Sequence, residues 1–175
     1  MGLTSNEVWL FVHGVLLWTI FLVASASGLI GLWNLRPEVT AIPGFQQRMR
    51  RLAAAVRVAA IAAWLAVLTG TYVLFPAYRA RPSDGVDLRK FPRAYLQSMT
   101  EIAGWNDAME WKQQMAWFAP ILATAVACVV ARYGERLAME PEIRRALVIL
   151  FAIGILTAAA AAAAGALINK VVSIH

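Results

Sequence analysis

The side chain with the clearest capacity for chemistry is a histidine inside an apolar stretch, "VWLFVHGVLLW", residues 8–18. His13 is one of only two histidines in the chain. A polar side chain in such surroundings is costly unless it has a partner or a ligand. Three roles are open to His13. In the first, it is a packed histidine that is hydrogen-bonded to a carbonyl, a threonine or a carboxylate. In the second it is a haem or metal ligand, and in the third it is a polar contact for a quinone or a lipid headgroup.

Haem b usually has a second axial ligand besides the histidine, and methionine is one that proteins use together with histidine. Met99, Met109 and Met115 fall on or near the side of the membrane predicted for His13, as does the chain-terminal His175. The cofactor-binding residues predicted on this basis are His13 and Met115.

In outline the chain resembles the four-helix b-type membrane cytochromes. Those proteins place paired histidines on facing helices, whereas this sequence has a single intramembrane histidine, His13. No ligand residue is therefore carried over from that family, and haem b stays one alternative among the three roles of His13.

A second polar group lies in "GWNDAMEWKQQMAW", residues 104–117. On a helix, Asp107 and Glu110 share a face because they are three residues apart. Glu101, Asp107 and Glu110 together with His13 are side chains of the types that bind metal ions. The alternative is the first turn of a membrane helix, with capping acids, a snorkelling lysine and anchoring tryptophans. No metal-binding, Walker, Rossmann or serine-elbow motif is present, and no catalytic residue is predicted.

The elements that carry these residues are predicted to be membrane-spanning helices. Hydrophobic residues make up 61% and charged residues 15% of the 175-residue chain, against about 45–50% and about 25% in soluble domains. Four apolar runs are near or above the roughly 20 residues that cross a bilayer. An open strand cannot leave its backbone unpaired in lipid, and the runs are too long for transmembrane β-strands, so each run is predicted to be helical. The predicted helices are about 5–33, 52–75, 107–133 and 142–170, joined in part by an outer loop, 76–106.

The predicted fold is a single all-α domain, an integral membrane four-helix bundle. In the outer loop, apolar residues from Pro92 to Ala103 recur at helical spacing, and Gly104 is expected to end that segment. This predicts a short amphipathic helix on the membrane surface. Pro120 is expected to kink the third span because it removes a backbone hydrogen bond. "TGTY", residues 69–72, ends the second span on the side of His13 and could hydrogen-bond to it.

Basic residues predict the orientation of the bundle. The two short links and their flanks are rich in arginine: Arg36, Arg48, Arg50, Arg51 and Arg57 in one, and Arg132, Arg136, Arg144 and Arg145 in the other. The positive-inside rule puts these links in the cytoplasm and both termini outside. The net charge of +6 then reflects helix ends near anionic lipid, not nucleic-acid binding. The absence of a targeting leader and the Ala/Arg-rich usage favour a bacterial cytoplasmic membrane.

Small residues are expected to govern how the helices pack, because close approach drives helix association in lipid. From His13, a period of 3.6 residues passes through Ile20, Ala24, Ser27 or Gly28, and Gly31. "GILTAAAAAAAGA", residues 154–166, is small on nearly every face. These faces predict a compact bundle, and self-association or contact with other membrane subunits.

The function favoured by these features is that of a small non-catalytic subunit or scaffold of a larger membrane complex, of which an energy-transducing complex is the favoured kind. The alternative is a haem b- or metal-binding redox protein, or a quinone-interacting one, centred on His13. A small-molecule carrier comes third, because a carrier would want polar pathway residues in mid-membrane.

Overall fold

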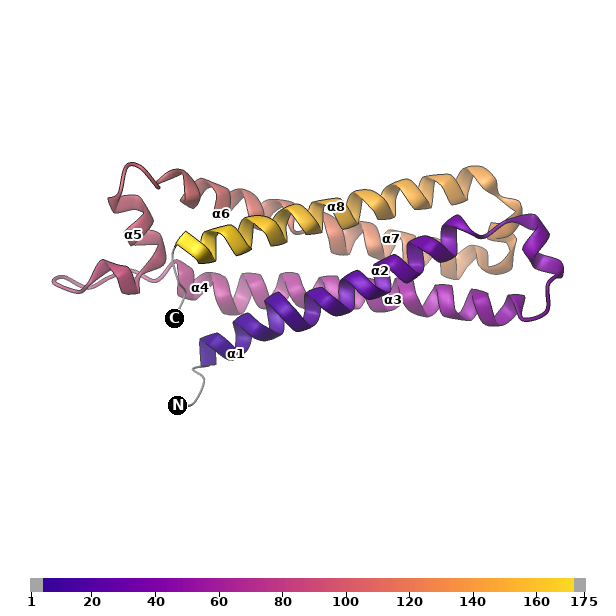
Figure 1. Ribbon diagram of the computed structural model, residues 1–175, viewed down its shortest axis with the longest axis horizontal. Coiled ribbons are helices and arrows are strands. Elements are labelled where there is room, and N and C mark those ends of the chain that lie inside the picture. The colour runs from indigo at the N-terminus through magenta and orange to yellow at the C-terminus, as the bar shows by residue number, and fades with distance from the viewer. Residues whose placement is uncertain (1–4, 172–175) are drawn as a thin grey trace.

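A computed structural model describes residues 5–171, and every regular element in that range is a helix. Four spans are long and apolar enough to cross a membrane, namely Glu7–Trp33, Phe45–Tyr78, Gly104–Met139 and Pro141–Val171. They lie side by side along the long axis of the molecule (Figure 1). The all-α four-helix bundle predicted from the sequence is therefore confirmed, and the chain has the build of a multi-pass membrane protein.

The spans are built from shorter elements. The first comprises α1 (Ser5–Phe11), a first π-helical segment (Val12–Leu17) and α2 (Trp18–Trp33). The second comprises α3 (Phe45–Thr69), a second π-helical segment (Gly70–Leu74) and α4 (Phe75–Tyr78). The third comprises α6 (Gly104–Met115), α7 (Phe118–Tyr133) and a 3-10 segment (Gly134–Met139), and the fourth is α8 (Pro141–Val171). Outside the spans lie α5 (Pro92–Ser98) and short 3-10 segments at Pro37–Ala41 and Leu88–Lys90.

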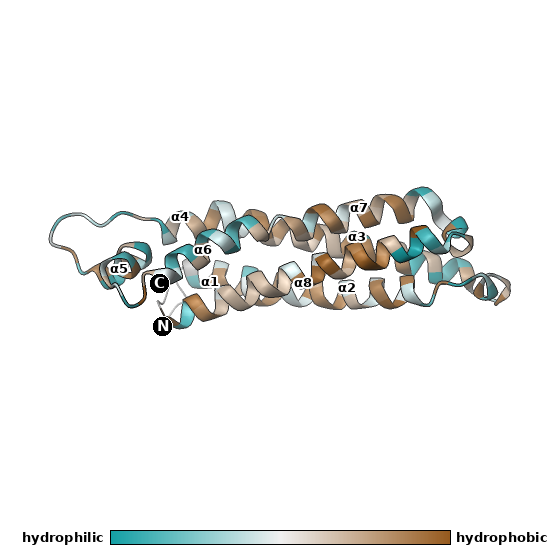
Figure 2. Ribbon diagram, turned by 90° about the horizontal axis from the view of Figure 1, so that it is seen from above, coloured by the Kyte–Doolittle hydropathy of each residue, from teal (hydrophilic) through white to brown (hydrophobic). Residues whose placement is uncertain are grey.

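The bundle has two chemically different ends. The terminal end carries the start of α1, the end of α8 and the long loop with α5 (Figure 1). The arginine end carries the two short links, residues 34–44 and 134–140. Hydrophobic residues dominate the spans between them, whereas hydrophilic residues gather at both ends and on α6 (Figure 2). Which end faces the cytoplasm stays a prediction of the positive-inside rule.

The third span is broken, as the position of Pro120 predicts. Ala116 and Trp117 form a turn between α6 and α7. Proline has no N–H to donate to the carbonyl four residues earlier, which is that of Ala116, and its ring would clash there. The break therefore falls one helical turn before the proline and allows α6 to leave the axis of α7.

The helix predicted in the long loop is shorter than its apolar spacing suggested. It ends at Ser98 because Met99 has an extended backbone, with φ −115° and ψ 106°. Gly104 starts α6 and does not end the loop helix, so that part of the prediction is wrong. Leu96 is fully buried, and α5 thus rests its apolar side on the end of the bundle.

The prediction of which residues form the buried stripe of the first span is only partly correct. Ile20 is exposed, and the buried face instead passes through Leu17, Phe21 and Ala24. The π-helical segment explains the difference, because its i→i+5 hydrogen bonds place an extra residue in the turn. The residue that lies on the same face as His13 two turns later is therefore Phe21, eight positions along the chain, and not Ile20.

Glycines on α2 do bring the helices into close contact. A Cβ atom on Gly28 would lie 2.8 Å from Cε1 of Phe151 on α8, and one on Gly31 would lie 3.0 Å from Cδ1 of Leu52 on α3. Larger residues at these positions would push the spans apart. Close packing of this kind holds the half of the bundle nearer the arginine end together.

Candidate functional site

The apolar core is divided into two clusters with a gap between them. The larger cluster fills the middle of the bundle and the arginine end, and includes Phe21, Val56 and Phe151. The smaller, which we call the terminal cluster, centres on Tyr78, Leu96, Met109 and Ile168. In each span one stretch of sequence lies between the two clusters and belongs to neither: residues 11–17, 64–74, 110–118 and 159–167.

These four stretches meet in what we call the polar layer. It consists of His13 from the first span, Thr69, Gly70 and Thr71 from the second, Lys112 and Gln113 from the third, and Gly165 from the fourth. Buried polar groups in a bundle of this composition are costly unless they are paired. The contacts within the layer therefore show which groups are satisfied and which are left for a ligand.

His13 is held by Thr69. The Nδ1 atom of His13 lies 3.2 Å from the Oγ1 atom of Thr69, as the "TGTY" segment had suggested. The same Oγ1 lies 2.7 Å from the carbonyl oxygen of Leu65. A hydroxyl has one proton, and the shorter contact to the carbonyl uses it. His13 therefore donates from Nδ1 to Oγ1, which leaves a lone pair on Nε2 in the neutral ring.

The His13 ring packs directly on Gly70. A Cβ atom at that position would lie 2.8 Å from Cε1 of the ring, so only glycine leaves room for it. His13 belongs to the first π-helical segment and Gly70 begins the second. Pro76 gives a reason for the second, since it cannot donate to the carbonyl of Tyr72. Such π-helical turns are rare and are frequent at functional sites.

Lys112 reaches across the layer to α8. Its Nζ atom lies 2.7 Å from the position that a Cβ atom would take on Gly165, and its ammonium group is close enough to act electrostatically on His13. Within residues 5–171 the ion pairs are Arg93–Glu110 and Arg145–Glu142. Lys112 thus has no carboxylate within 4.0 Å in the described part of the chain.

Beside Lys112, Gln113 ties α6 to the second span. The hydroxyl of Thr71 donates to Oε1 of Gln113 over 3.3 Å. Consecutive residues of α6 therefore face two different neighbours, with Lys112 directed to α8 and Gln113 to the second π-helical segment. All four spans thus contribute to one layer.

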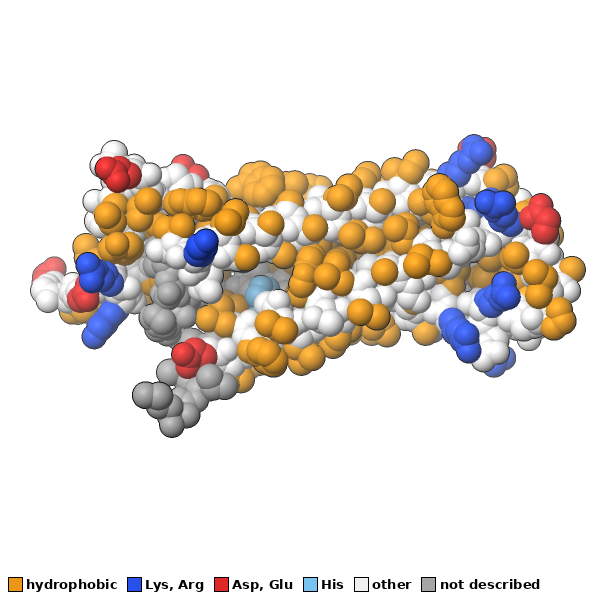
Figure 3. All heavy atoms as spheres, viewed as in Figure 1, with side chains coloured by type: hydrophobic (Ala, Val, Ile, Leu, Met, Phe, Trp, Pro, Cys, Tyr) orange, Lys and Arg blue, Asp and Glu red, His pale blue; other side chains and the backbone are white. Residues whose placement is uncertain are grey.

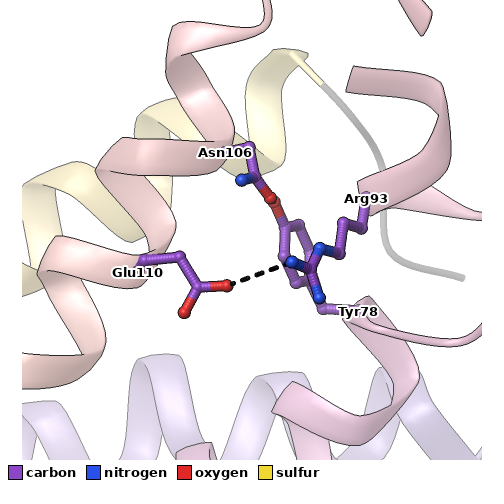
Figure 4. Close-up of polar contacts among 4 residues, drawn as sticks. All are labelled: Tyr78, Arg93, Asn106 and Glu110. Carbon is purple, nitrogen blue, oxygen red and sulfur yellow. Dashed lines mark hydrogen bonds and ion pairs between the residues drawn. The ribbon is translucent and has the colours of Figure 1, made fainter. Parts of the chain in front are cut away.

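The terminal end of the bundle is closed above this layer. The terminal cluster lies about one helical turn further out on each span, with Leu10, Phe75, Met109 and Ile168 as its members there. A set of four polar side chains, Tyr78, Arg93, Asn106 and Glu110, also connects the elements of this region (Figure 4). The hydroxyl of Tyr78 donates to Oδ1 of Asn106 over 3.1 Å, and Arg93 on α5 pairs with Glu110 over 3.8 Å. Packed apolar side chains of the terminal cluster therefore lie between the terminal end and the polar layer.

The polar layer is open to the side instead. Helix α8 packs against α2, α6 and α7, whereas α1 diverges from it toward the N-terminus (Figure 1). Figure 3 shows a hollow between α1 and α8 with a histidine at its floor, and His13 is the one histidine among the described residues. Apolar side chains lie along much of the described rim of the opening. In a bilayer such an opening faces lipid.

The acids predicted as metal ligands lie elsewhere. Glu110 is paired with Arg93, while Asp107 and Glu101 are exposed at the terminal end. Across residues 5–171, no group of three or more His, Cys, Asp and Glu residues is placed to hold a metal ion. The structure therefore does not bring these acids together with His13.

The predicted haem ligands are placed differently. Met115 is half-buried at the end of α6. It follows Lys112 by three residues and so shares its side of the helix, about one turn deeper. His175 lies outside the described residues.

A separate cleft of about 640 Å³ lies at the arginine end, lined mainly by residues 40–47 with Arg50 and Glu135. None of the residues predicted as ligands borders it. It is a hollow of the link surface, and the side chains with chemical capacity converge in the polar layer.

Sequence reasoning missed the roles of Lys112, Gly70 and Gly165. Lys112 was interpreted as a snorkelling residue, and nothing local indicates that its side chain turns toward α8. Comparison of the chain with protein-family models, curated proteins and solved structures finds no match.

Proposed function

We propose that this protein binds the polar head of a lipid-soluble molecule, such as a quinone or a lipid, in the polar layer. The observation that supports this best is the position of His13 at the floor of a hollow that opens sideways between α1 and α8 (Figure 3). At the terminal end, the packed side chains of the terminal cluster lie over the layer. A ligand would therefore enter from the bilayer and leave its chain there.

The chemistry of the layer suits recognition of a head group. Small-molecule sites have mostly apolar walls and a few placed polar groups. His13 is held in one orientation by Thr69 and Gly70, so little freedom is lost when a ligand binds. Its Nε2 lone pair can accept a hydrogen bond from a hydroxyl of the ligand.

Haem b held by His13 and Met115 is the other ligand of this layer that the residues allow. With Nδ1 bonded to Thr69, Nε2 would be the nitrogen offered to iron, and the threonine would fix the ring orientation. Oxidised and dithionite-reduced absorption spectra of the protein in mild detergent, with His13→Ala alongside, separate this ligand from a colourless one.

The test of the main proposal compares what co-purifies with two variants. Protein purified in mild detergent is extracted with organic solvent, and the extract is analysed by mass spectrometry for wild type, His13→Ala and Ile20→Ala. Ile20 is exposed on the same span and serves as the matched control. We expect one chain-bearing, polar-headed molecule to be depleted in His13→Ala alone. Identical extracts from all three proteins would refute the proposal.

We also propose that the protein is a non-catalytic subunit of a larger membrane complex, on a separate observation. One exposed face of α8 carries residues at alternating spacings of four and three: Ile149, Ile153, Leu156, Ala160, Ala163 and Leu167. That is the spacing of a helix-pairing seam, and its central alanines allow close approach. Native mass spectrometry should show association in wild type and its loss in Ala160→Trp. A monomer in both would count against this role.

A further inference from the structure

We infer that the head group recognised in the polar layer is an oxyanion, a phosphate or a carboxylate carried on a lipid chain. This inference rests on the proposed function and specifies its ligand. The observation behind it is Lys112, a cation within a membrane span that has no carboxylate partner in residues 5–171. Cations at such positions are costly and normally pair with an opposite charge.

The direction of the Lys112 side chain strengthens this point. A lysine near a helix end usually extends toward water and keeps its charge there. Lys112 instead reaches Gly165 on α8, three residues deeper than Ile168 of the terminal cluster. Its ammonium group therefore lies about one helical turn below Ile168 and within electrostatic range of His13.

The acids near Lys112 in sequence do not neutralise it. Glu110 is engaged by Arg93 of α5 (Figure 4), and Asp107 is exposed. No carboxylate of residues 5–171 thus lies within 4.0 Å of the Lys112 ammonium, whereas the hollow beside it opens to lipid (Figure 3). An oxyanion on a chain fits both features, because its charge would pair with Lys112 while its tail stays in the bilayer.

The two sources of such a head are a phospholipid and a fatty acid, and both offer oxygens that accept from an ammonium group. Because Nδ1 of His13 donates to Oγ1 of Thr69, Nε2 of the neutral ring is left as an acceptor. A phosphodiester or carboxylate anion carries no proton, so its oxygens accept from Lys112. The Nε2 atom of His13 is left to accept from a hydroxyl elsewhere on the head group, such as those of phosphatidylglycerol.

The test is native mass spectrometry of the purified protein in a neutral detergent. The probes are dioleoylphosphatidylglycerol, oleate, dioleoylphosphatidylcholine and inorganic phosphate. The variants are Lys112→Gln and Lys170→Gln, since Lys170 is an exposed lysine on α8 near the same end and gives the same change of charge. Circular dichroism and thermal unfolding check that each variant is folded, and Gly165→Ala, which displaces the ammonium without removing it, provides a second perturbation.

We expect wild type to bind one of the two anionic amphiphiles at least about tenfold more tightly than phosphatidylcholine, and which one identifies the source. Lys112→Gln should lose that preference, Gly165→Ala should weaken it, and Lys170→Gln should keep it. Equal binding of charged and zwitterionic lipid, or an unchanged preference in Lys112→Gln, would overturn the inference while leaving a His13-dependent site in place. Inorganic phosphate binding as tightly as the amphiphiles would overturn the lipid-chain part. If His13→Ala changes binding of no amphiphile, the proposed function itself fails.

Discussion

At the scale of single residues, the polar layer depends on one hydroxyl. Thr69 gives its proton to the carbonyl of Leu65 and accepts from His13. The threonine therefore sets which ring nitrogen of His13 carries the proton. The chemistry proposed for His13 depends on that assignment, because only the unprotonated nitrogen can accept from a ligand.

Replacing Thr69 with valine removes the hydroxyl that accepts from Nδ1 of His13, and the backbone of Ala66 remains as a partner of the ring. Loss of one such hydrogen bond costs about 0.5–1.5 kcal/mol, so we expect Thr69→Val to lower the free energy of unfolding by that amount. Unfolding in mixed detergent micelles measures it. Thr69→Ser keeps the hydroxyl and is the control, and an equal loss in both variants would assign the effect to packing.

Gly70 permits the approach of the His13 ring, and a double-mutant cycle tests this. Gly70→Ala places a methyl group 2.8 Å from Cε1 of the ring, and overpacking of this kind costs about 1–3 kcal/mol. In a His13→Ala background the same change should be neutral or stabilising, because alanine is the better helix former by about 1 kcal/mol. Additive effects on the free energy of unfolding would show that the two residues do not interact.

At the scale of elements, α5 illustrates which interactions hold the long loop on the bundle. Its ion pair, Arg93–Glu110, spans 3.8 Å and is about one third exposed on both sides. Such pairs contribute little, about 0–1 kcal/mol. Leu96 is fully buried in the terminal cluster, and truncation of a leucine in such a site costs about 2–5 kcal/mol.

Leu96→Ala should therefore release α5, whereas Arg93→Gln should not. The measurement is the rate at which the segment 79–103 is cut during limited proteolysis of the protein in detergent. We expect much faster cleavage in Leu96→Ala and a rate close to that of wild type in Arg93→Gln. The reverse order would mean that the polar contacts of Figure 4 hold the loop.

At the scale of the whole molecule, the arginine end determines the predicted orientation. A cysteine at position 83 of the long loop and one at position 47 of the first link, each in a Cys128→Ser background, probe the two sides. Both native residues, Ser83 and Gln47, are exposed. With a membrane-impermeant maleimide on intact cells, we expect labelling of Ser83→Cys and none of Gln47→Cys. Labelling of Gln47→Cys alone would invert the orientation.

The sequence predicted the broad organisation well because the signals involved are local. Hydrophobic length and the demand for satisfied backbone groups in lipid predict four helices. Pro120 predicts the break in the third span from covalent geometry alone. Gly104 was misread for a related reason: glycine ends helices often, but Met99 had already ended this one through its backbone angles.

The candidate site could be predicted only in part. His13 stood out because a polar residue among apolar ones is visible in the sequence, and "TGTY" was recognised as a possible partner. The predicted acids were chosen by ligand type, and the structure places Glu110 against Arg93 and leaves Asp107 and Glu101 exposed. Ligand type alone does not specify direction around a helix, and direction decides whether side chains converge.

What the sequence determined by itself is the number, approximate position and helical nature of the spans, because each depends on neighbouring residues and on the solvent. Only the tertiary structure decided that His13 meets Thr69, 56 positions away, and that Lys112 turns toward Gly165. These contacts depend on the rotation and depth of each helix relative to the others. The π-helical segments alter that rotation, and a regular period read from the sequence does not contain them.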